Sequence, residues 1–107
     1  MSPSHPFTFK FAPQVQTHLE WIDRKYYGLI RRTIRSQLSY SPEVQTRNRK
    51  LLEQPAHLGA TWELRIGPNN RFRVFYEVEV AQHIVLVLAI GIKEGNRLII
   101  GGKEFVE

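Results

Sequence analysis

Hydrophobic and polar residues alternate in several short stretches of this chain, and such alternation is typical of β-strands that bury one face. Residues 7–11 carry three phenylalanines at alternate positions, so we expect all three to face the core. Residues 62–66 and 72–78 alternate in the same way on either side of a Gly-Pro-Asn-Asn sequence at 67–70. This arrangement predicts a β-hairpin with its turn at 67–70.

Two further stretches complete the predicted sheet. Residues 84–90 are apolar without interruption, as expected of a central strand that is covered on both faces. Residues 98–100 predict a short last strand, after which Gly101 and Gly102 are expected to release the tail. Residues 1–6 contain two prolines and two serines, which predicts a flexible N-terminal tail.

A helical pattern occupies the region between the first strand and residue 41. Pro13 suits the first turn of a helix, and Ser41-Pro42 ends the pattern. The apolar residues that recur at helical spacing are Val15, Leu19, Ile22, Tyr26, Leu29, Ile30, Ile34 and Leu38. They form either one long helix or a hairpin of two helices. We favour the hairpin, because Asp23 is a suitable N-cap and Gly28 weakens a helix interior.

The order of these elements predicts an α+β fold. One N-terminal strand is followed by the helical hairpin and then by a three- to four-stranded antiparallel meander sheet. The chain has 107 residues, which is enough for one hydrophobic core and too few for two, so residues 1–107 are expected to form a single domain. With the helices packed on one face of the sheet, the opposite face is expected to stay open.

The chain is basic, with a formal net charge of +5 and a pI near 9.9. Eleven of the fifteen lysine and arginine residues lie between Arg24 and Arg73, a window that holds only three acidic residues. Such a concentration favours a polyanionic partner such as nucleic acid. A small domain can also be basic merely for solubility, and the sequence leaves this second interpretation open.

Several classes of protein are disfavoured by what the sequence lacks. There is no cysteine, which removes disulfides, thiolate nucleophiles and cysteine metal sites. The four histidines show no metal-ligand spacing and no cofactor motif is present, so we expect neither metal nor cofactor. His57, the histidine nearest the basic segment, is expected to be an exposed loop residue. No secretory signal or bilayer-spanning apolar run is present, so a cytoplasmic protein without a membrane partner is expected.

The predicted hairpin places charged residues on the face that points away from the helices, because alternate residues of a strand share a face. The residues expected on or beside this open face are Glu63, Arg65, Arg71, Arg73, Phe75 and Lys93. Arg65 and Arg73 lie side by side in the predicted pairing, where an anion such as phosphate would relieve their repulsion. The alternative is that both arginines form ordinary surface pairs with Glu63 and Glu77.

A rim of further basic residues would extend this surface. Arg47, Arg49 and Lys50 precede the hairpin and, with Arg71, are candidates for RNA binding through phosphate contacts. Phe75 is a candidate for stacking on exposed bases, because aromatic rings bind single-stranded RNA in this way. The open face is therefore predicted to bind nucleic acid.

The succession of hairpin and central strand resembles the RelE/ParE superfamily of toxins. The matching segments are Trp-Glu-Leu-Arg-Ile-Gly at 62–67, Phe-Arg-Val-Phe-Tyr-Glu-Val at 72–78 and Leu-Ala-Ile-Gly-Ile-Lys at 88–93. In that superfamily a hydrophobic and basic strand is followed by an Arg-Val-Phe-Tyr strand and by a strand that ends in Gly-x-Lys. The resemblance covers nearly the whole chain. It implies the same fold and the toxin half of a type II toxin–antitoxin pair.

The resemblance also implies candidate catalytic residues. RelE-type members cut mRNA in the ribosomal A site by attack of a 2′-hydroxyl on the neighbouring phosphate, with basic side chains stabilising the transition state. Arg65, Arg73 and Lys93 match such basic residues by position. Glu63 stands where RelE has a lysine used as base, which makes it the candidate general base. Residues 98–99 stand where RelE has a catalytic tyrosine, and no acid replaces it.

Three functions are compatible with this resemblance. The first is a metal-independent, ribosome-dependent mRNA endonuclease that inhibits translation. The second is a ParE-like toxin that binds DNA gyrase and blocks it without cutting RNA, which the missing acid and base residues would fit. The third is a non-catalytic RNA- or ribosome-binding module. Both toxin hypotheses imply a cognate antitoxin, whose disordered acidic tail would fold into an amphipathic helix on the toxin.

Overall fold

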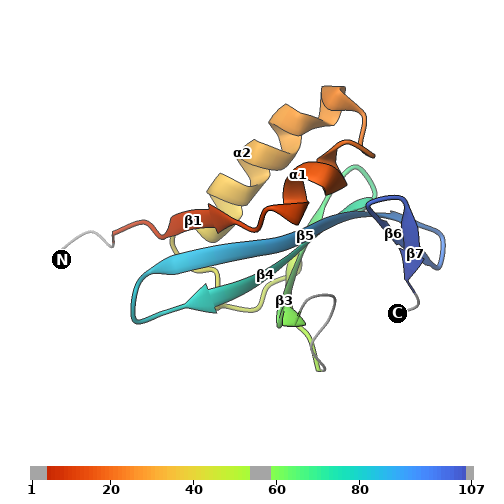
Figure 1. The fold of residues 1–107 in the computed structure, drawn as a ribbon. Helices are drawn as coiled ribbons and strands as arrows, with labels where there is room; N and C mark the ends of the chain where they lie inside the picture. Colours follow the sequence, from red (N-terminus) through yellow and green to blue (C-terminus); the bar gives the residue numbers. More distant parts are fainter. Residues whose placement is uncertain (1–4, 54–58, 106–107) are drawn as a thin grey trace.

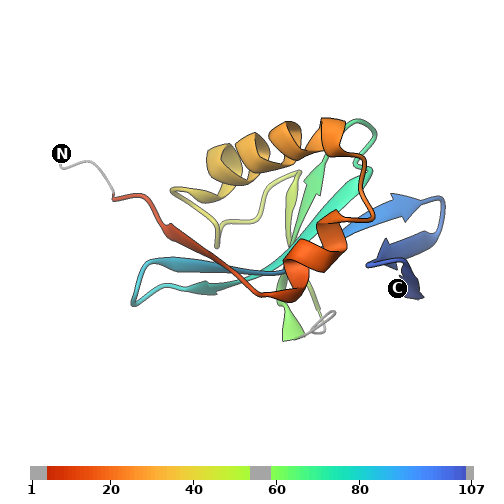
Figure 2. The ribbon, with the colours of Figure 1, turned by 45° about the horizontal axis from the view of Figure 1, so that its top comes forward.

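A computed structural model of the chain describes residues 5–53 and 59–105 and shows a mixed α/β fold built on one twisted sheet (Figure 1). The helical elements are α1 (Gln14–Leu19), the 3₁₀ turn η1 (Arg24–Tyr26) and α2 (Tyr27–Leu38). The strands are β1 (Thr8–Phe11), β2 (Arg49–Leu51), β3 (Trp62–Ile66), β4 (Phe72–Glu79), β5 (Ile84–Glu94), β6 (Arg97–Ile100) and β7 (Lys103–Phe105). Both α-helices lie on the same side of the sheet, as Figure 2 shows from a second direction.

The described strands form one seven-stranded sheet in which β5 is central. Strands β2 to β7 are neighbours in chain order and pair antiparallel, whereas β1 pairs in parallel with the first half of β5. The predicted antiparallel meander is therefore present, but the predicted number of three to four strands is wrong. The unpredicted strands β2 and β7 have three residues each, too few to leave an alternating pattern in the sequence.

A β-bulge interrupts the pairing of β4 with β5. Phe75 pairs with Ala89 and Tyr76 pairs with Val87, so Leu88 has no partner on β4. The bulge reverses the alternation of β5 at this point, because Val85 and Val87 before it and Ile90 after it face the helices, whereas Ala89 faces the other way.

Helix α1 supplies hydrogen bonds at this bulge. Gln14 and His18 are four residues apart and so lie on the same face of α1. Nε2 of Gln14 donates to the carbonyl of Leu88 at 3.2 Å, and the backbone N–H of Ile90 donates to Nδ1 of His18 at 3.3 Å. Polar contacts as well as apolar packing therefore fix α1 to β5.

The break between the helices lies at the position that Asp23 predicted. Its side chain accepts a hydrogen bond at 3.0 Å from the backbone N–H of Lys25 at the start of η1. A packed helical hairpin is not confirmed, because α1 has only six residues and packs on β5. α2 has twelve residues and buries Ile30, Ile34 and Leu38.

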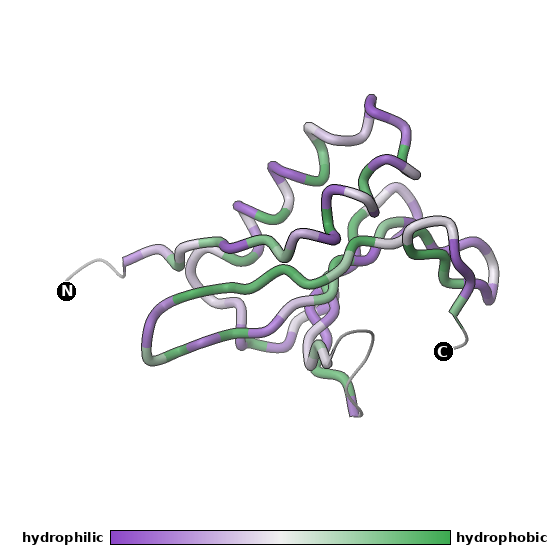
Figure 3. Tube along the Cα trace, in the orientation of Figure 1, coloured by the Kyte–Doolittle hydropathy of each residue, from purple (hydrophilic) through white to green (hydrophobic). Residues whose placement is uncertain are grey.

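The larger core lies between the helices and strands β3, β4 and β5. Trp62 and the next two alternate residues of β3 face it, as predicted, and Figure 3 shows the apolar residues that run along β5. The expectation for the first strand is only partly met, since Phe7 is buried, Phe9 is half-buried and Phe11 is 53% exposed. The cause is a groove that separates Phe11 from α2.

A smaller core covers the other face of the sheet. Phe75 is 2% exposed and packs with Ala60, Ala89, Leu98 and Ile100. The last two residues come from β6, so the C-terminal strands close part of the face that the sequence predicted to be open. That prediction is therefore wrong.

Glycines allow β6 and β7 to bend toward this smaller core. A Cβ on Gly91 would lie 2.8 Å from the side chain of Ile100 and 2.9 Å from the carbonyl oxygen of Ile99, closer than packing allows. Gly101 and Gly102 have φ angles of 60° and 80° and form the turn into β7. The expectation that these two glycines release the tail is wrong, because the chain turns back and pairs once more.

Candidate functional site

Strands β3 and β4 bring together three of the charged residues that the sequence predicted as a site. Arg65 and Arg73 are register partners, and Glu63 lies two residues before Arg65 on the same face. Oε1 of Glu63 is 3.1 Å from Nε of Arg65, and its Oε2 is 3.3 Å from an Nη atom of Arg73. We refer to Glu63, Arg65 and Arg73 as the hairpin triad. Its carboxylate supplies the negative charge that compensates the two neighbouring arginines.

The hairpin triad is largely buried. Glu63 is 3% exposed and Arg73 is 7% exposed, while the side chain of Arg65 keeps 35% of its surface in solvent. Nε of Arg73 also donates to the carbonyl of Asn70 at 3.0 Å. Buried charges are tolerated when ion pairs and hydrogen bonds replace their hydration. The geometry thus favours ion pairing of both arginines with Glu63 over an anion held between them. Glu77 was the other predicted partner, and its Oε1 has no hydrogen-bond partner among the described residues.

Phe75 is not available for stacking on a base. It is the register partner of Glu63 on β4, and its ring lies in the smaller core under Leu98 and Ile100. The prediction of base stacking at Phe75 is wrong, because strand alternation identifies a face but not the elements that later cover it.

The backbones of Lys93 and Arg71 are neighbours, but the two side chains do not belong to one site. The backbone N–H of Lys93 donates to the carbonyl of Arg71 at 2.7 Å. Because Gly91 pairs with Arg73, Lys93 shares the face of Arg73 further along β5. The guanidinium of Arg71 instead lies 5.8 Å from the ring centre of Tyr26 in η1, a cation–π distance. The catalytic role of Lys93 and the RNA-binding role of Arg71 stay predictions.

The three residues of the predicted rim have different environments. Arg49 fastens β2 to the end of α2, since its guanidinium donates to the carbonyl of Gln37. Lys50 is the register partner of Glu63 on β2 and is half-buried, and Arg47 is exposed. RNA binding by these residues stays a prediction, but Arg49 has a structural role that the sequence did not indicate.

His18 and His83 take part in packing. His18 is 7% exposed at the bulge of β5, and the ring of His83 stacks on Phe7 with 3.8 Å between the ring centres. His57 lies outside the described residues. No group of three or more possible metal ligands occurs within residues 5–53 and 59–105. In these same ranges, no helix has the length and apolar character needed to cross a membrane.

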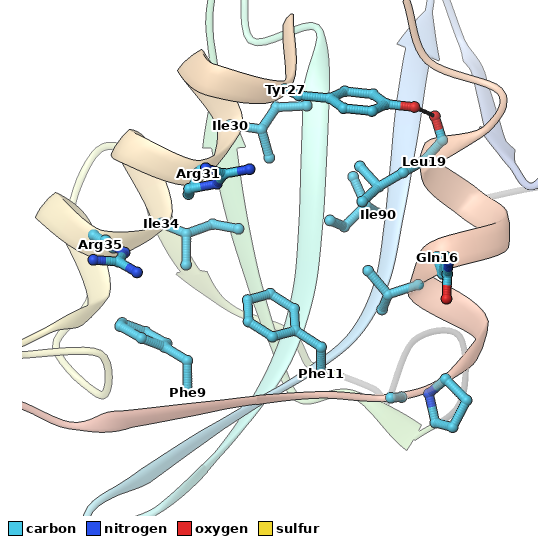
Figure 4. Close-up of a pocket in the computed structure, with 13 residues that line it drawn as sticks. Phe9, Phe11, Gln16, Leu19, Tyr27, Ile30, Arg31, Ile34, Arg35 and Ile90 are labelled. Carbon is cyan, nitrogen blue, oxygen red and sulfur yellow. Dashed lines mark hydrogen bonds between the residues drawn. The ribbon is translucent and has the colours of Figure 1, made fainter. Parts of the chain in front are cut away.

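A groove between β1, α1 and α2 is a second candidate site, which the sequence analysis did not identify. Its volume is about 620 Å³. Figure 4 shows Phe9 and Phe11 on one side, apolar side chains of both helices facing inward, and Arg31 and Arg35 on α2. A signal was present in the sequence, because these arginines are four residues apart and directly follow the apolar positions of the helical pattern.

Comparisons with known proteins agree with this fold. A family model described as the ParE toxin of the type II toxin–antitoxin system parDE matches residues 9–96. Among solved structures, the chain is similar to a chain of the RelBE2 toxin–antitoxin complex from Mycobacterium tuberculosis. The TM-score is 0.63 and the identity 20%, over 82% of this chain and 99% of that chain. At this identity the likeness concerns the fold alone. No curated protein sequence matches the chain significantly.

Proposed function

We propose that this chain, which belongs to the ParE toxin family of type II toxin–antitoxin systems, is a toxin that acts by binding its target and not by cleaving RNA. The family match spans both helices, the hairpin of β3 and β4, and all of β5. Membership of this family supports the toxin function. The hairpin triad is the observation that carries the second half of the proposal.

The hairpin triad leaves Glu63 poorly placed to act as a general base. A general base must come within hydrogen-bond distance of the proton that it removes. Both oxygens of Glu63 are occupied by arginines and the residue is 3% exposed, so a ribose hydroxyl would have to displace Arg65 or Arg73. This geometry weighs against the mRNA endonuclease and suits a toxin that inhibits by contact.

We take DNA gyrase as the target, which is the function that the resemblance to ParE implies. A toxin of this kind needs an exposed surface rather than a reactive carboxylate. Arg31, Arg32 and Arg35 are exposed on α2 and offer such a surface, whereas two members of the hairpin triad are buried. Cleavage of mRNA on the ribosome is the competing hypothesis, and it requires the hairpin triad to open.

The proposed cellular partner is a cognate antitoxin that holds the toxin inactive in the cytoplasm. The similar solved structure is itself a toxin–antitoxin complex. The net charge of +5 favours an acidic partner, because complementary charge increases both the rate and the specificity of association.

The test is tightly controlled expression in a bacterium with three readouts: growth, an SOS reporter, and the 5′ ends of mRNA mapped within minutes. The proposal predicts growth arrest with SOS induction, because blocked gyrase damages DNA, and no new 5′ ends within codons. The control is Leu64→Asp, which places a carboxylate in the larger core and unfolds the domain.

Two outcomes would contradict the proposal. New 5′ ends clustered inside translated codons, without SOS induction, would establish the endonuclease hypothesis instead. Unchanged growth at a level of protein that is folded and soluble in the cell would refute the toxin function altogether.

A further inference from the structure

The turn η1 and helix α2 carry positive charge that the described chain leaves without a counter-charge. Five exposed basic residues lie there, and we refer to them as the basic ridge: Arg24 and Lys25 of η1, and Arg31, Arg32 and Arg35 of α2. No acidic residue occurs between Asp23 and Glu43 in the sequence. Within residues 5–53 and 59–105, no carboxylate forms an ion pair with a member of the basic ridge. Its charge is therefore available to an anion from outside the chain.

This distribution of charge opposes the formation of the helix. Positive side chains at the N-terminal end of a helix are repelled by its dipole, and α2 has no acidic residue in its first turn. Arg31 and Arg35 are four residues apart, a spacing at which like charges destabilise a helix. Exposed helices are more often stabilised by charges of alternating sign. The basic ridge therefore lowers the stability of the isolated chain, and a bound polyanion would remove this repulsion.

The outer side of α2 allows a rigid partner to approach closely. α2 lies over one face of the sheet (Figure 2), and its outer side presents Gly28 and Ser36 one turn before and after Arg32. A Cβ on Gly28 would lie 3.0 Å from an Nη atom of Arg32, so this guanidinium lies over the backbone of Gly28 and toward η1. Arg35 follows Arg24 by eleven residues, which corresponds to roughly 16 Å along the helix axis. The basic ridge thus runs from η1 along α2 with small residues beside its central arginine.

A membrane surface matches the basic ridge poorly. Helices that lie on a membrane insert apolar side chains between the lipids. The apolar residues Ile30, Ile34 and Leu38 of α2 are instead buried in the larger core or below it. The basic ridge therefore offers charge without an apolar anchor.

Single-stranded RNA also matches poorly, because its recognition relies on aromatic rings that stack on bases. The aromatic residues of η1 and α2 are Tyr26 and Tyr27, and both are half-buried. The ring of Tyr26 is occupied by Lys25 and Arg71, whose charged groups lie 5.2 and 5.8 Å from its centre. The hydroxyl of Tyr27 donates to the carbonyl of Leu19. Binding at the basic ridge therefore depends on phosphate contacts alone.

We propose that the basic ridge binds the phosphate backbone of duplex DNA without regard to sequence. Along one strand of DNA each phosphate advances about 3.4 Å along the axis, so a row of roughly 16 Å faces about five phosphates. Four of the five members of the basic ridge are arginines, whose guanidinium groups bind two phosphate oxygens at once. The inference rests on the proposed function only for the source of the DNA in the cell, which is the duplex on which gyrase acts. The toxin then contacts gyrase and its DNA together.

The test is fluorescence anisotropy of labelled DNA duplexes of two unrelated sequences, titrated with the purified full-length protein in the absence of gyrase. We expect dissociation constants on the order of 10⁻⁶ M at low salt that differ by less than about twofold between the sequences. The logarithm of the binding constant should fall with the logarithm of the salt concentration with a slope of about −4, since each phosphate contact contributes about −0.9. Unlabelled single-stranded RNA and polyglutamate of matched charge should compete at least about fivefold less well.

Two double variants test which charges are responsible. Arg24→Gln combined with Arg32→Gln removes two members of the basic ridge that lie outside the groove lining. It should weaken duplex binding by about tenfold and reduce the magnitude of the salt slope by about 2. The matched control is Lys10→Gln combined with Lys103→Gln, which removes the same charge from exposed positions outside the basic ridge and should weaken binding by less than about twofold. Thermal unfolding verifies that both proteins are folded.

Equal losses of affinity in the two double variants would overturn the inference, because binding would then follow net charge and not the basic ridge. Tighter binding of single-stranded RNA or polyglutamate than of the duplex would assign the basic ridge to another partner and would overturn it as well. The binding assay contains neither gyrase nor cells. A protein that arrests growth with SOS induction but does not bind the duplex therefore refutes this inference and leaves the proposed function standing. Duplex binding by a protein that leaves growth unchanged refutes the proposed function and supports this inference.

Discussion

The hairpin triad and the groove both place arginines beside apolar residues. Only in the hairpin triad does the chain itself supply a counter-charge for the arginines and a cover for the apolar residues. In the triad, Glu63 meets both arginines within 3.3 Å, and the smaller core lies beside it. In the groove, Arg31 and Arg35 stay exposed, and so does half of Phe11. Arginines with an internal counter-charge contribute to the fold, whereas exposed arginines at an apolar surface are available to a partner.

The largest expected effect comes from Phe75, next to the hairpin triad. Phe75→Ala leaves a cavity in the smaller core and lowers the free energy of unfolding by about 3–4 kcal/mol. Phe11→Ser, in the groove, lowers it by less than about 1 kcal/mol because that side chain is already half in solvent. Urea denaturation measures both. Similar small losses for the two variants would mean that the second face of the sheet is open after all.

Glu63→Gln tests the ion pairs of the triad. The change leaves the buried Arg73 without its counter-charge and lowers the free energy of unfolding by about 3 kcal/mol, with a smaller share from the partly exposed Arg65. The matched control is Glu104→Gln, which breaks the exposed pair with Arg97 and changes stability by less than about 0.5 kcal/mol. Equal effects of the two substitutions in urea denaturation would contradict a buried triad.

The variant Tyr76→Phe, compared with the wild-type protein at several pH values, tests whether the hydroxyl of Tyr76 is buried. The hydroxyl of Tyr76 donates to the carbonyl of Pro42 at 2.8 Å, so its loss costs about 1 kcal/mol at pH 7. Burial raises the pKa of Tyr76 above its usual value of about 10. The neutral form thus stabilises the folded state fully below about pH 10, and this contribution is lost as the pH rises above that value.

Above about pH 10 the advantage of the wild-type protein over Tyr76→Phe should therefore shrink and then change sign, because unfolding of the wild-type protein then releases a proton that phenylalanine lacks. Denaturation curves recorded at pH 7, 9, 10 and 11 measure it. A difference that stays constant across this range would show that Tyr76 is not buried in its neutral form.

The smallest effect on stability is expected at the arginines of the groove. Arg35→Ala changes the free energy of unfolding by less than about 0.5 kcal/mol, because its side chain is exposed. Arg73→Ala, which removes one partner of a buried ion pair, lowers it by about 2 kcal/mol or more. Thermal unfolding of the two variants compares the groove with the hairpin triad directly. A larger loss of stability for Arg35→Ala than for Arg73→Ala would contradict the difference between the two regions.

The sequence predicted the faces of the hairpin correctly, because strand alternation is a local property. It placed Trp62 toward the helices and Arg65 beside Arg73, and both are observed. It did not predict that Phe75 is buried, since that depends on β6 bending over the sheet at Gly91, a contact between distant parts of the chain.

The groove could not be predicted from the sequence for a similar reason. The alternation of residues 7–11 predicted burial of Phe11, but burial also requires an opposing element, and α2 does not reach this residue. The uniform apolar run of β5 likewise contains no alternation that could reveal the bulge at Leu88. The family resemblance identified the toxin fold. The proposed mechanism depends on whether Glu63 is paired, and this could be known only from the positions of Arg65 and Arg73 in the fold.

The most direct test of a toxin that acts by contact is plasmid supercoiling by purified DNA gyrase in the presence of this purified protein. We expect supercoiled product to decrease as the protein concentration rises, and to decrease equally with Lys93→Gln, because the proposed inhibition by contact involves no catalytic lysine. Supercoiling that proceeds at the same rate at every concentration of folded protein would contradict the account.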